Sequence, residues 1–253
     1  MLLLLPPSET KRVGGTNLTI EQVHLSYGQL NDARDAVLAD LISLCKKPEL
    51  AAKALKLSPK QLGDIEANLA ITKAPTMPAY QRYGGTLYKA IDIEGFGPHE
   101  IEAMRAHVLM QSALFGLISA TDRIPWYRLS ANTVLPKVSL KQIWPEHQDA
   151  AWARLTGGPI IDLRSKAYVD LAPIPEHMDS FFVEVVAEGA DGSRRALNHF
   201  NKTAKGELVG AFVRAKKAPE TFAQLKAIAK KAGLGLERDG KTLYLITSEV
   251  VRA

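Results

Sequence analysis

Residues 1–12 have the sequence MLLLLPPSETKR, and this opening decides the fold. Leu2 to Leu5 are all apolar, and Pro6 and Pro7 end the run, which is typical of a short strand buried on both faces of a sheet. The run is too short for a secretory signal, which needs roughly 7–15 apolar residues, or for a membrane-spanning helix, which needs about 20. The sequence therefore predicts a buried first strand that leads into a polar loop.

A second stretch of the same kind, residues 159–163 (PIIDL), also leads into a polar loop, residues 164–166. Apolar periodicity predicts helices over residues 31–45, 49–57, 58–70, 100–112, 202–214 and 220–231. Strands are expected over residues 181–187, 234–238 and 241–247, with hairpin turns at Asp191-Gly192 and Asp239-Gly240. With no repeat or linker visible, we predict a mixed α/β (α+β) fold. We expect residues 1–253 to form a single compact domain with a mixed central sheet, surrounding helices and a basic cleft.

The composition is that of an ordinary globular protein, with 46% hydrophobic and 23% charged residues. Lys and Arg outnumber Asp and Glu by 32 to 27, a net charge of +5 that favours anionic partners such as nucleic acid or phosphorylated metabolites. A single cysteine, Cys45, excludes an intramolecular disulfide and is expected in the core. These features predict a cytoplasmic protein with no membrane segment.

The loops that follow the two apolar strands contain the first candidate site. If the strands are parallel neighbours, both loops open at the same edge of the sheet, where ligands of α/β proteins gather. Lys11, Arg164 and Lys166 would then form a cationic rim. Ser8, Thr10 and Ser165 would supply hydrogen-bond donors. Such a set is suited to a phosphate or nucleic-acid ligand, and the alternative is that these are ordinary solvated loops.

Aromatic residues beside cations extend the candidate site. Trp126-Tyr127-Arg128 places a guanidinium next to aromatic rings, and Tyr88 follows a flexible Gly84-Gly85 pair. Aromatic faces can stack on bases while cations hold phosphates, although isolated aromatics are more often core residues. Lys202 and Lys205 are three residues apart on a predicted helix and share a face, which is usually solvated.

Other kinds of site have no signature in the sequence. The six histidines (His24, His99, His107, His147, His177 and His199) lack metal-binding spacing, so no metal site is predicted. There is no phosphate-binding glycine loop and no dinucleotide fingerprint, so no cofactor is predicted. The oligomeric state is not predicted.

Seven segments together resemble the peroxide stress protein family named YaaA. They are residues 1–11 (MLLLLPPSETK), 83–88 (YGGTLY), 114–117 (LFGL), 124–129 (IPWYRL), 143–144 (IW), 161–168 (IDLRSKAY) and 200–206 (FNKTAKG). They occur in the family's order over most of the chain. The resemblance implies one compact mixed α/β fold with a deep, positively charged cleft. It also implies cytosolic protection from hydroperoxide, by limiting free iron and oxidative DNA damage, and binding of double-stranded DNA.

The resemblance also implies which residues recur at the family's site. These are Thr10, Lys11, Tyr88, Arg128, Ser165, Tyr168 and Lys202, which largely coincide with the loops chosen above. The family's DNA binding is linked to a helix-hairpin-helix with a glycine-rich turn. The matching stretch here, residues 49–70, turns through Leu57-Ser58-Pro59, and proline has no N–H to offer a phosphate.

The leading hypothesis is a stress-response protein that binds double-stranded DNA or another phosphate-bearing polyanion in a basic cleft and limits iron-dependent damage. Its phosphate contacts would be Ser8, Thr10, Lys11, Tyr88, Arg128, Arg164, Ser165, Lys166 and Lys202. The alternative is an enzyme that acts on a phosphorylated or nucleotide-like small molecule in the same cleft, with Lys202, Ser165 and Tyr168 as catalytic candidates. A third possibility is an iron-sequestering protein with carboxylate ligands.

Overall fold

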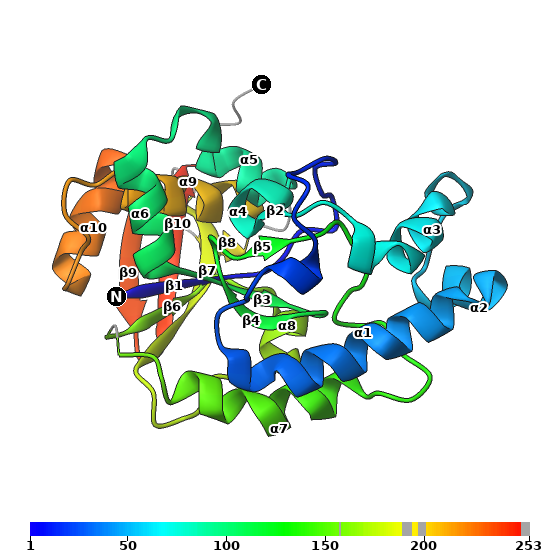
Figure 1. The fold of residues 1–253 in the computed structure, drawn as a ribbon. Helices are drawn as coiled ribbons and strands as arrows, with labels where there is room; N and C mark the ends of the chain where they lie inside the picture. The colour runs from blue at the N-terminus through cyan, green and yellow to red at the C-terminus, as the bar shows by residue number, and fades with distance from the viewer. Residues whose placement is uncertain (157, 189–193, 197–200, 249–253) are drawn as a thin grey trace.

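A mixed eight-stranded sheet runs through the centre of the computed structural model, which describes residues 1–156, 158–188, 194–196 and 201–248 (Figure 1). The strand order is β4-β3-β1-β6-β7-β10-β9, and β8 pairs with β7. The strands are β1 (Leu2–Leu5), β3 (Val108–Ser112), β4 (Gly116–Ser119), β6 (Ile160–Asp162), β7 (Ser180–Glu188), β8 (Arg194–Ala196), β9 (Gly235–Asp239) and β10 (Thr242–Ser248). A separate small ladder joins β2 (Met77–Pro78) to β5 (Arg123–Ile124).

The first strand lies at the middle of this sheet. β1 pairs in parallel with β3 on one side and with β6 on the other. The parallel arrangement continues from β6 through β7 to β10, while β4, β8 and β9 are antiparallel to their neighbours. All four residues of β1 are buried, because helices cover both faces of a parallel sheet. The predicted mixed α/β fold and buried opening strand are confirmed.

Helices lie on both sides of the sheet (Figure 1). They are α1 (Asn31–Cys45), α2 (Pro48–Ala54), α3 (Gly63–Leu69), α4 (Ala79–Arg82), α5 (Thr86–Ile91), α6 (Pro98–His107), α7 (Leu140–Trp152), α8 (Lys166–Leu171), α9 (Asn201–Val213) and α10 (Phe222–Lys231). Helices α5, α6 and α9 pack on one side, with Leu3 and Leu5 of β1 in the same apolar cluster as α9. Leu2 and Leu4 point the other way, toward Trp152 of α7.

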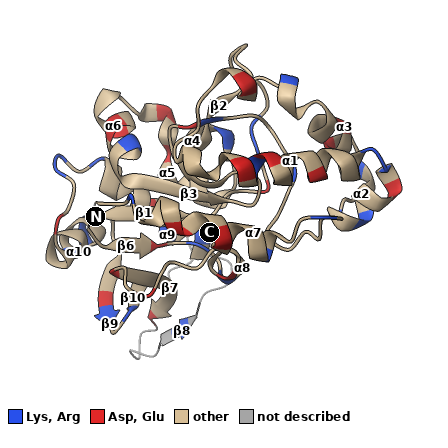
Figure 2. Ribbon diagram, turned by 60° about the horizontal axis from the view of Figure 1, so that its bottom comes forward, with Lys and Arg blue, Asp and Glu red and all other residues tan. Residues whose placement is uncertain are grey.

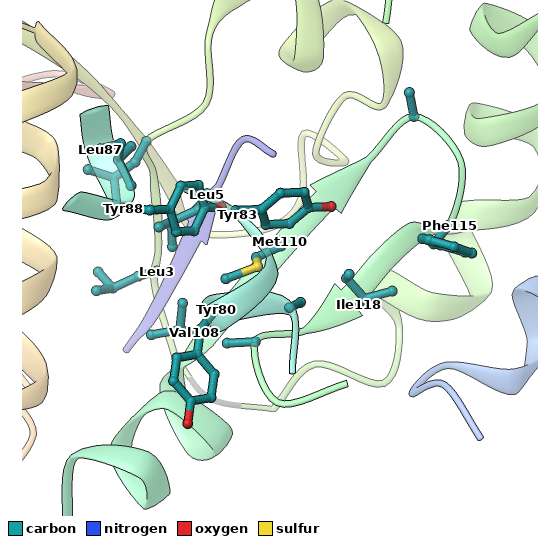
Figure 3. Packing of buried hydrophobic residues seen from close by; sticks show 14 of the residues in the cluster. Leu3, Leu5, Tyr80, Tyr83, Leu87, Tyr88, Val108, Met110, Phe115 and Ile118 are labelled. Carbon is teal, nitrogen blue, oxygen red and sulfur yellow. The ribbon is translucent and has the colours of Figure 1, made fainter. Parts of the chain in front are cut away.

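The apolar cluster beneath α5 contains aromatic rings as well as aliphatic side chains. Figure 3 shows Tyr83 and Tyr88 beside Leu5, with Met110 of β3 next to them. The two tyrosine rings are 5.2 Å apart between centroids and tilted by 42°. This cluster therefore lies directly under the carboxyl end of β1, where the candidate site begins.

Helices α2 and α3 lie beyond the end of α1, away from the sheet (Figure 1). The turn between them contains Lys56, whose φ of 53° is in the left-handed region. A short 3-10 helix, Pro59–Gln61, follows, and Ser58 and Gln61 form a capping box at its start. In the described part of the chain, no helix is both long and apolar enough to cross a membrane.

Most of the predicted elements are confirmed within a few residues, and α1 matches its predicted bounds. The prediction of a helix over residues 100–112 is wrong in its second half, because the helix ends at His107 and β3 starts at Val108. Val108, Leu109 and Met110 are apolar on both faces of β3, and so short an apolar run does not distinguish helix from strand. Helices α7 and α8 were not predicted. The predicted turn at Asp191-Gly192 lies outside the described residues.

Candidate functional site

The loops after β1 and β6 open at the same edge of the sheet. Leu4 is in register with Asp162 in the parallel β1–β6 pair, and the Leu163 N–H donates to the Leu4 carbonyl at 2.8 Å. The prediction that the two apolar strands are parallel neighbours is therefore confirmed. We call this side of the molecule the carboxyl edge.

Lys11 is the buried cation of the carboxyl edge. Its side chain lies over the Tyr127 ring, with Nζ 4.2 Å from the ring centroid and 5.6 Å from that of Tyr83. Nζ donates to the Ser8 carbonyl at 2.9 Å, and no carboxylate of the described residues is within ion-pair distance. Burial, reinforced by the nearby Arg128, lowers the pKa of Lys11 to about 7. Near neutral pH this amine is therefore divided between its charged and uncharged forms.

Lys11 is held in place by a short pairing with the segment before α5. The Arg12 N–H donates to the Arg82 carbonyl at 2.8 Å, and the Gly84 N–H donates to the Thr10 carbonyl at 2.9 Å. Arg82 is fully buried, and its guanidinium donates to the carbonyls of four residues: Arg12, Gly14, Pro75 and Ile124. Sequence reasoning did not assign any role to Arg82, whose partners lie in three separate segments.

Hydroxyl groups form a chain behind Lys11. The Tyr83 and Tyr127 hydroxyls are 2.8 Å apart, and the Tyr127 hydroxyl is also 2.8 Å from Ser112 Oγ at the end of β3. Burial raises the pKa of both tyrosines well above the ordinary value, so the phenols stay protonated. These three linked hydroxyls therefore form a neutral, hydrogen-bonded surface behind the Lys11 amine.

Arg128 is the second cation of the carboxyl edge. Its Nη2 is 3.3 Å from Oε2 of Glu9; the Arg128 side chain is 12% exposed, whereas that of Glu9 is 71% exposed. The Asn68 side chain fixes the Arg128 backbone, accepting from its N–H at 2.8 Å and donating to its carbonyl at 2.9 Å. Asp64 lies one turn earlier in α3 and faces both Arg128 and Lys11. Burial raises the pKa of this carboxyl, and the charges of the two cations partly offset that rise.

Tyr168 joins the second loop to this cluster. Burial is the main cause that raises the pKa of Tyr168. Tyr127 and Glu9 raise it further, and Arg128 lowers it, so the phenol lies near all three residues. The side chain comes from α8, which starts at Lys166 directly after the β6 loop. We call Glu9, Lys11, Tyr127, Arg128 and Tyr168 the carboxyl-edge cluster.

Arg164 has a different position from the one predicted. It is fully buried, and its Nε and Nη2 donate to Asp162 at 2.8 and 2.7 Å. Its Nη1 donates to the carbonyls of Tyr168 and Ala172 at 3.1 and 2.7 Å. The prediction that Arg164 belongs to a cationic rim is wrong, because every arm of its guanidinium is used to shape the loop after β6. The Asp-x-Arg pattern of residues 162–164 is the sequence feature that could have indicated this ion pair.

The remaining predicted residues surround the cluster. Thr10, Ser165, Lys166 and Lys202 are exposed and Ser8 is half-buried. Lys205, one turn after Lys202 in α9, is buried over the Phe182 ring and donates to the Arg164 carbonyl at 3.4 Å, so the start of α9 lies beside the β6 loop. Burial lowers the pKa of Lys205 to about 8.

Tyr88 is buried at the base of the same loop. Its hydroxyl donates to the Pro6 carbonyl at 2.6 Å, and burial raises its pKa. The side chain therefore supports the turn after β1, and its contact with a ligand stays a prediction. The same is true of the phosphate-binding and catalytic roles assigned from the sequence to the other residues, and of the basic cleft itself.

Comparisons with known proteins show which family the chain is similar to. A family model described as "Peroxide stress protein YaaA" matches residues 1–239. A UPF0246 protein of Corynebacterium glutamicum is 38% identical over 244 residues, which cover 94% of this chain and 96% of the relative. A UPF0246 protein of Streptomyces coelicolor is 33% identical over 242 residues, which cover 94% of this chain and 93% of the relative.

The chain belongs to the YaaA family. The resemblance drawn from the seven sequence segments is thereby confirmed. Three of the YaaA-like segments supply the carboxyl-edge cluster: the first contains Glu9 and Lys11, the fourth contains Tyr127 and Arg128, and the sixth contains Tyr168.

Sequence reasoning on this YaaA-family chain missed residues that position the cations. Glu9 pairs with Arg128, Asn68 holds the Arg128 backbone, and Asp64 faces both cations. Asn68 and Asp64 lie in α3, and the sequence gives no sign that this helix reaches the loop after β1.

Proposed function

We propose that this protein acts in the response to peroxide stress by binding a phosphate-bearing anion at the carboxyl-edge cluster. One observation carries the proposal: Arg128 lies close to Lys11, and its ion-pair partner is the exposed carboxylate of Glu9 at 3.3 Å. A phosphate group that displaced Glu9 would accept charge-assisted hydrogen bonds from Arg128 and stabilise the charged form of Lys11. The name of the family supports the stress role.

The recessed position of the two cations favours a small ligand. Lys11 is 9% exposed and the Arg128 side chain 12%. A DNA duplex, about 20 Å across by its groove dimensions, presents its phosphates on a convex surface and would not reach them directly. A phosphorylated or nucleotide-like small molecule is the better match, and Lys11, with a pKa of about 7, would serve such a ligand as a general acid or base. Ser165, Tyr168 and Lys202 remain further candidates around it.

Small-ligand binding is tested by calorimetry with inorganic phosphate and a set of nucleotides. We expect at least one of them to bind, and Arg128→Ala to weaken it by roughly tenfold to a hundredfold, the effect of losing a charged hydrogen bond. Lys217→Ala is the matched control, since Lys217 also pairs with one exposed glutamate, Glu220, at 3.0 Å. Equal affinities in the wild type and Arg128→Ala, or no binding of any probe, would refute this function.

Double-stranded DNA is the second candidate, and a different observation favours it. Lys53, Lys56 and Lys60 are exposed around the turn between α2 and α3, and Figure 2 shows this basic region at the end of the molecule away from the sheet. Duplex binding there should weaken with salt, with a slope of about 0.9 per neutralised phosphate. Replacing the three lysines with glutamine should lower that slope, while Arg128→Ala should not. Absence of binding at low salt would eliminate DNA as the ligand.

A role in limiting iron-dependent damage would follow from ligand binding in this proposal. No three His, Cys, Asp or Glu side chains within residues 1–156, 158–188, 194–196 and 201–248 are grouped as metal ligands. The cellular test compares hydroperoxide survival of a strain lacking the protein after complementation with the wild type or Arg128→Ala. We expect rescue by the wild type and loss of rescue by the variant.

A further inference from the structure

A cavity lies at the opposite edge of the sheet from the carboxyl-edge cluster. It has a volume of about 410 Å³ and is lined by the first residue of β1, Leu2, by the start of β3 and by the end of β4. This volume is within the range of small-molecule sites, which is about 300–1,000 Å³. Because β1 and β3 start here, we call it the amino-edge pocket.

The amino-edge pocket combines an apolar floor with cations from two elements. Leu2, Leu109 and Leu155 supply the apolar surface. Arg105 comes from the last turn of α6, and Arg154 follows α7. Arg105 has one surface ion pair, with Glu102 at 3.2 Å. Such exposed pairs contribute little to stability, so another anion can readily replace Glu102.

Arg154 has neither an ion pair nor a hydrogen bond with any described side chain, although it lines the pocket. Asp122, which like Arg154 acts on the Tyr27 phenol, already has its own donors. It accepts from the Ser26 N–H at 2.9 Å, from Ser26 Oγ at 2.7 Å and from the Ser119 N–H at 3.0 Å. Asp122 is thus fixed by its own donors and leaves the Arg154 guanidinium available to a ligand.

Tyr27 is the strained residue of the pocket wall. Its φ of 60° is in the left-handed region, which costs a residue with a bulky side chain on the order of 1–3 kcal/mol and is concentrated at functional sites. Its hydroxyl has no hydrogen-bond partner in the described part of the chain. Burial and Asp122 raise the pKa of Tyr27 to about 12, and Arg154 opposes the shift, so the phenol is a neutral donor close to that cation.

We propose that the amino-edge pocket is a second binding site, for a small organic anion: a carboxylate or a phosphate monoester with a short apolar body. The anionic group is held by Arg154 and Arg105, with the Tyr27 hydroxyl as donor, and the body rests on Leu2, Leu109 and Leu155. The hydroxyls of Ser119 and Thr121, 3.2 Å apart on the wall, add donors for a ligand with further oxygen atoms. This site is independent of the proposed function at the carboxyl edge.

The test uses phenyl phosphate, benzoate and phenol as probes, with binding measured by calorimetry on the full chain. We expect phenyl phosphate or benzoate to bind saturably and phenol much more weakly, and the tighter of the two anions identifies the class. Arg154→Gln should weaken that binding by roughly tenfold or more, and Tyr27→Phe, which keeps the ring and removes the hydroxyl, should weaken it less.

A control variant makes the result specific. Lys141→Gln removes an exposed cation at the other end of α7 and should leave binding unchanged. The proposal is overturned if neither anion saturates the protein by about 10 mM, where a site of millimolar affinity would be filled. It is equally overturned if Arg154→Gln binds like the wild type, or if phenol binds as well as the anions.

Discussion

Lys11 shows how strongly the surroundings of one residue change its chemistry. Its amine is buried between two aromatic rings and beside Arg128, and no carboxylate of the described residues is in ion-pair contact with it. Water would solvate a lysine ammonium far better than this environment does, which is why burial is the main cause of its lowered pKa. The residue was predicted from the sequence as a surface cation of a loop. Its burial depends on Tyr83 and Tyr127, which lie far away in the chain and could not be paired with it from the sequence.

The lowered pKa of Lys11 predicts a pH dependence of stability. The folded pKa of about 7 is below the unfolded value near 10.4, so between these pH values the unfolded chain binds one more proton than the folded chain. The free energy of unfolding should therefore rise with pH in this window, by up to about 1.4 kcal/mol per pH unit for this one group. Lys11→Met should remove that part of the slope.

This pH dependence is measured by urea unfolding at a series of pH values from 7 to 10. Lys205 acts in the same direction, since burial lowers its pKa to about 8, and Lys205→Met is therefore the matched control. Each single variant should remove its own share of the slope. A slope that Lys11→Met leaves intact would show that Lys11 is not titrating as the structure indicates.

Arg164 is expected to be a stabilising residue of the loop after β6. Arg164→Met leaves Asp162 buried without its partner, and breaking a buried ion pair on one side costs about 3–5 kcal/mol. Arg105→Met, at an exposed pair, should change the free energy of unfolding by less than about 1 kcal/mol. Urea unfolding of the two variants checks the contrast. Similar losses in both would contradict the buried placement of Arg164.

At the scale of elements, the turn between α2 and α3 contains a lysine in the left-handed backbone conformation that glycine usually adopts. Lys56 has a φ of 53°, and the left-handed region costs a non-glycine residue roughly 1–2 kcal/mol. Lys56→Gly should therefore raise the free energy of unfolding by up to about 1 kcal/mol, after the larger chain entropy of glycine is subtracted. The same change at Lys53, which is exposed in α2, should lower stability by about the same amount. Thermal unfolding of the two variants gives the signs directly.

The crossing of α5 and α9 depends on a glycine. A Cβ added to Gly206 of α9 would collide with the Leu87 carbonyl and the Ala90 side chain of α5. Gly206→Ala should therefore lower stability by about 1–3 kcal/mol, as overpacking does, or by more if the helices must move apart. Gly63→Ala in α3, where a Cβ meets nothing within 4 Å, should instead be neutral or stabilising. Thermal unfolding distinguishes the pair, and a loss in Gly63→Ala equal to that in Gly206→Ala would rule out the packing explanation.

Elements with a continuous local signal were predictable, and those defined by distant partners were not. The apolar stripe of α1 and the capping of the α10 start by Thr221 are local features. The sequence predicts β3 as the end of a helix, because only its pairing with β1 and β4 makes these apolar residues a strand. Arg82 and Asn68 were missed for the same reason: their roles are contacts with backbone groups of other segments.

At the scale of the whole molecule, the two halves of the chain meet inside one sheet. β4, β3 and β1 come from the first half and β6, β7, β10 and β9 from the second, and the β1–β6 pair joins the two groups. The close packing of α5 against Gly206 of α9 joins the halves a second time. We therefore expect a single cooperative unfolding transition. The three tryptophans, all between residues 126 and 152, should report by fluorescence the same midpoint as helix loss by circular dichroism. Two separate transitions would show that the chain folds as two units instead of the single domain predicted.

The central position of β1 also has a consequence for how the chain is made. Translation delivers this apolar strand before either of its neighbours, and β6 leaves the ribosome only after residues 6–159 have been synthesised. Until then the nascent chain exposes a segment with a strong tendency to stick to other chains. We expect the completed protein to fold slowly, because pairs so distant in sequence must close late. Cells that make the protein in quantity should depend on a chaperone that shields β1 until β6 is available.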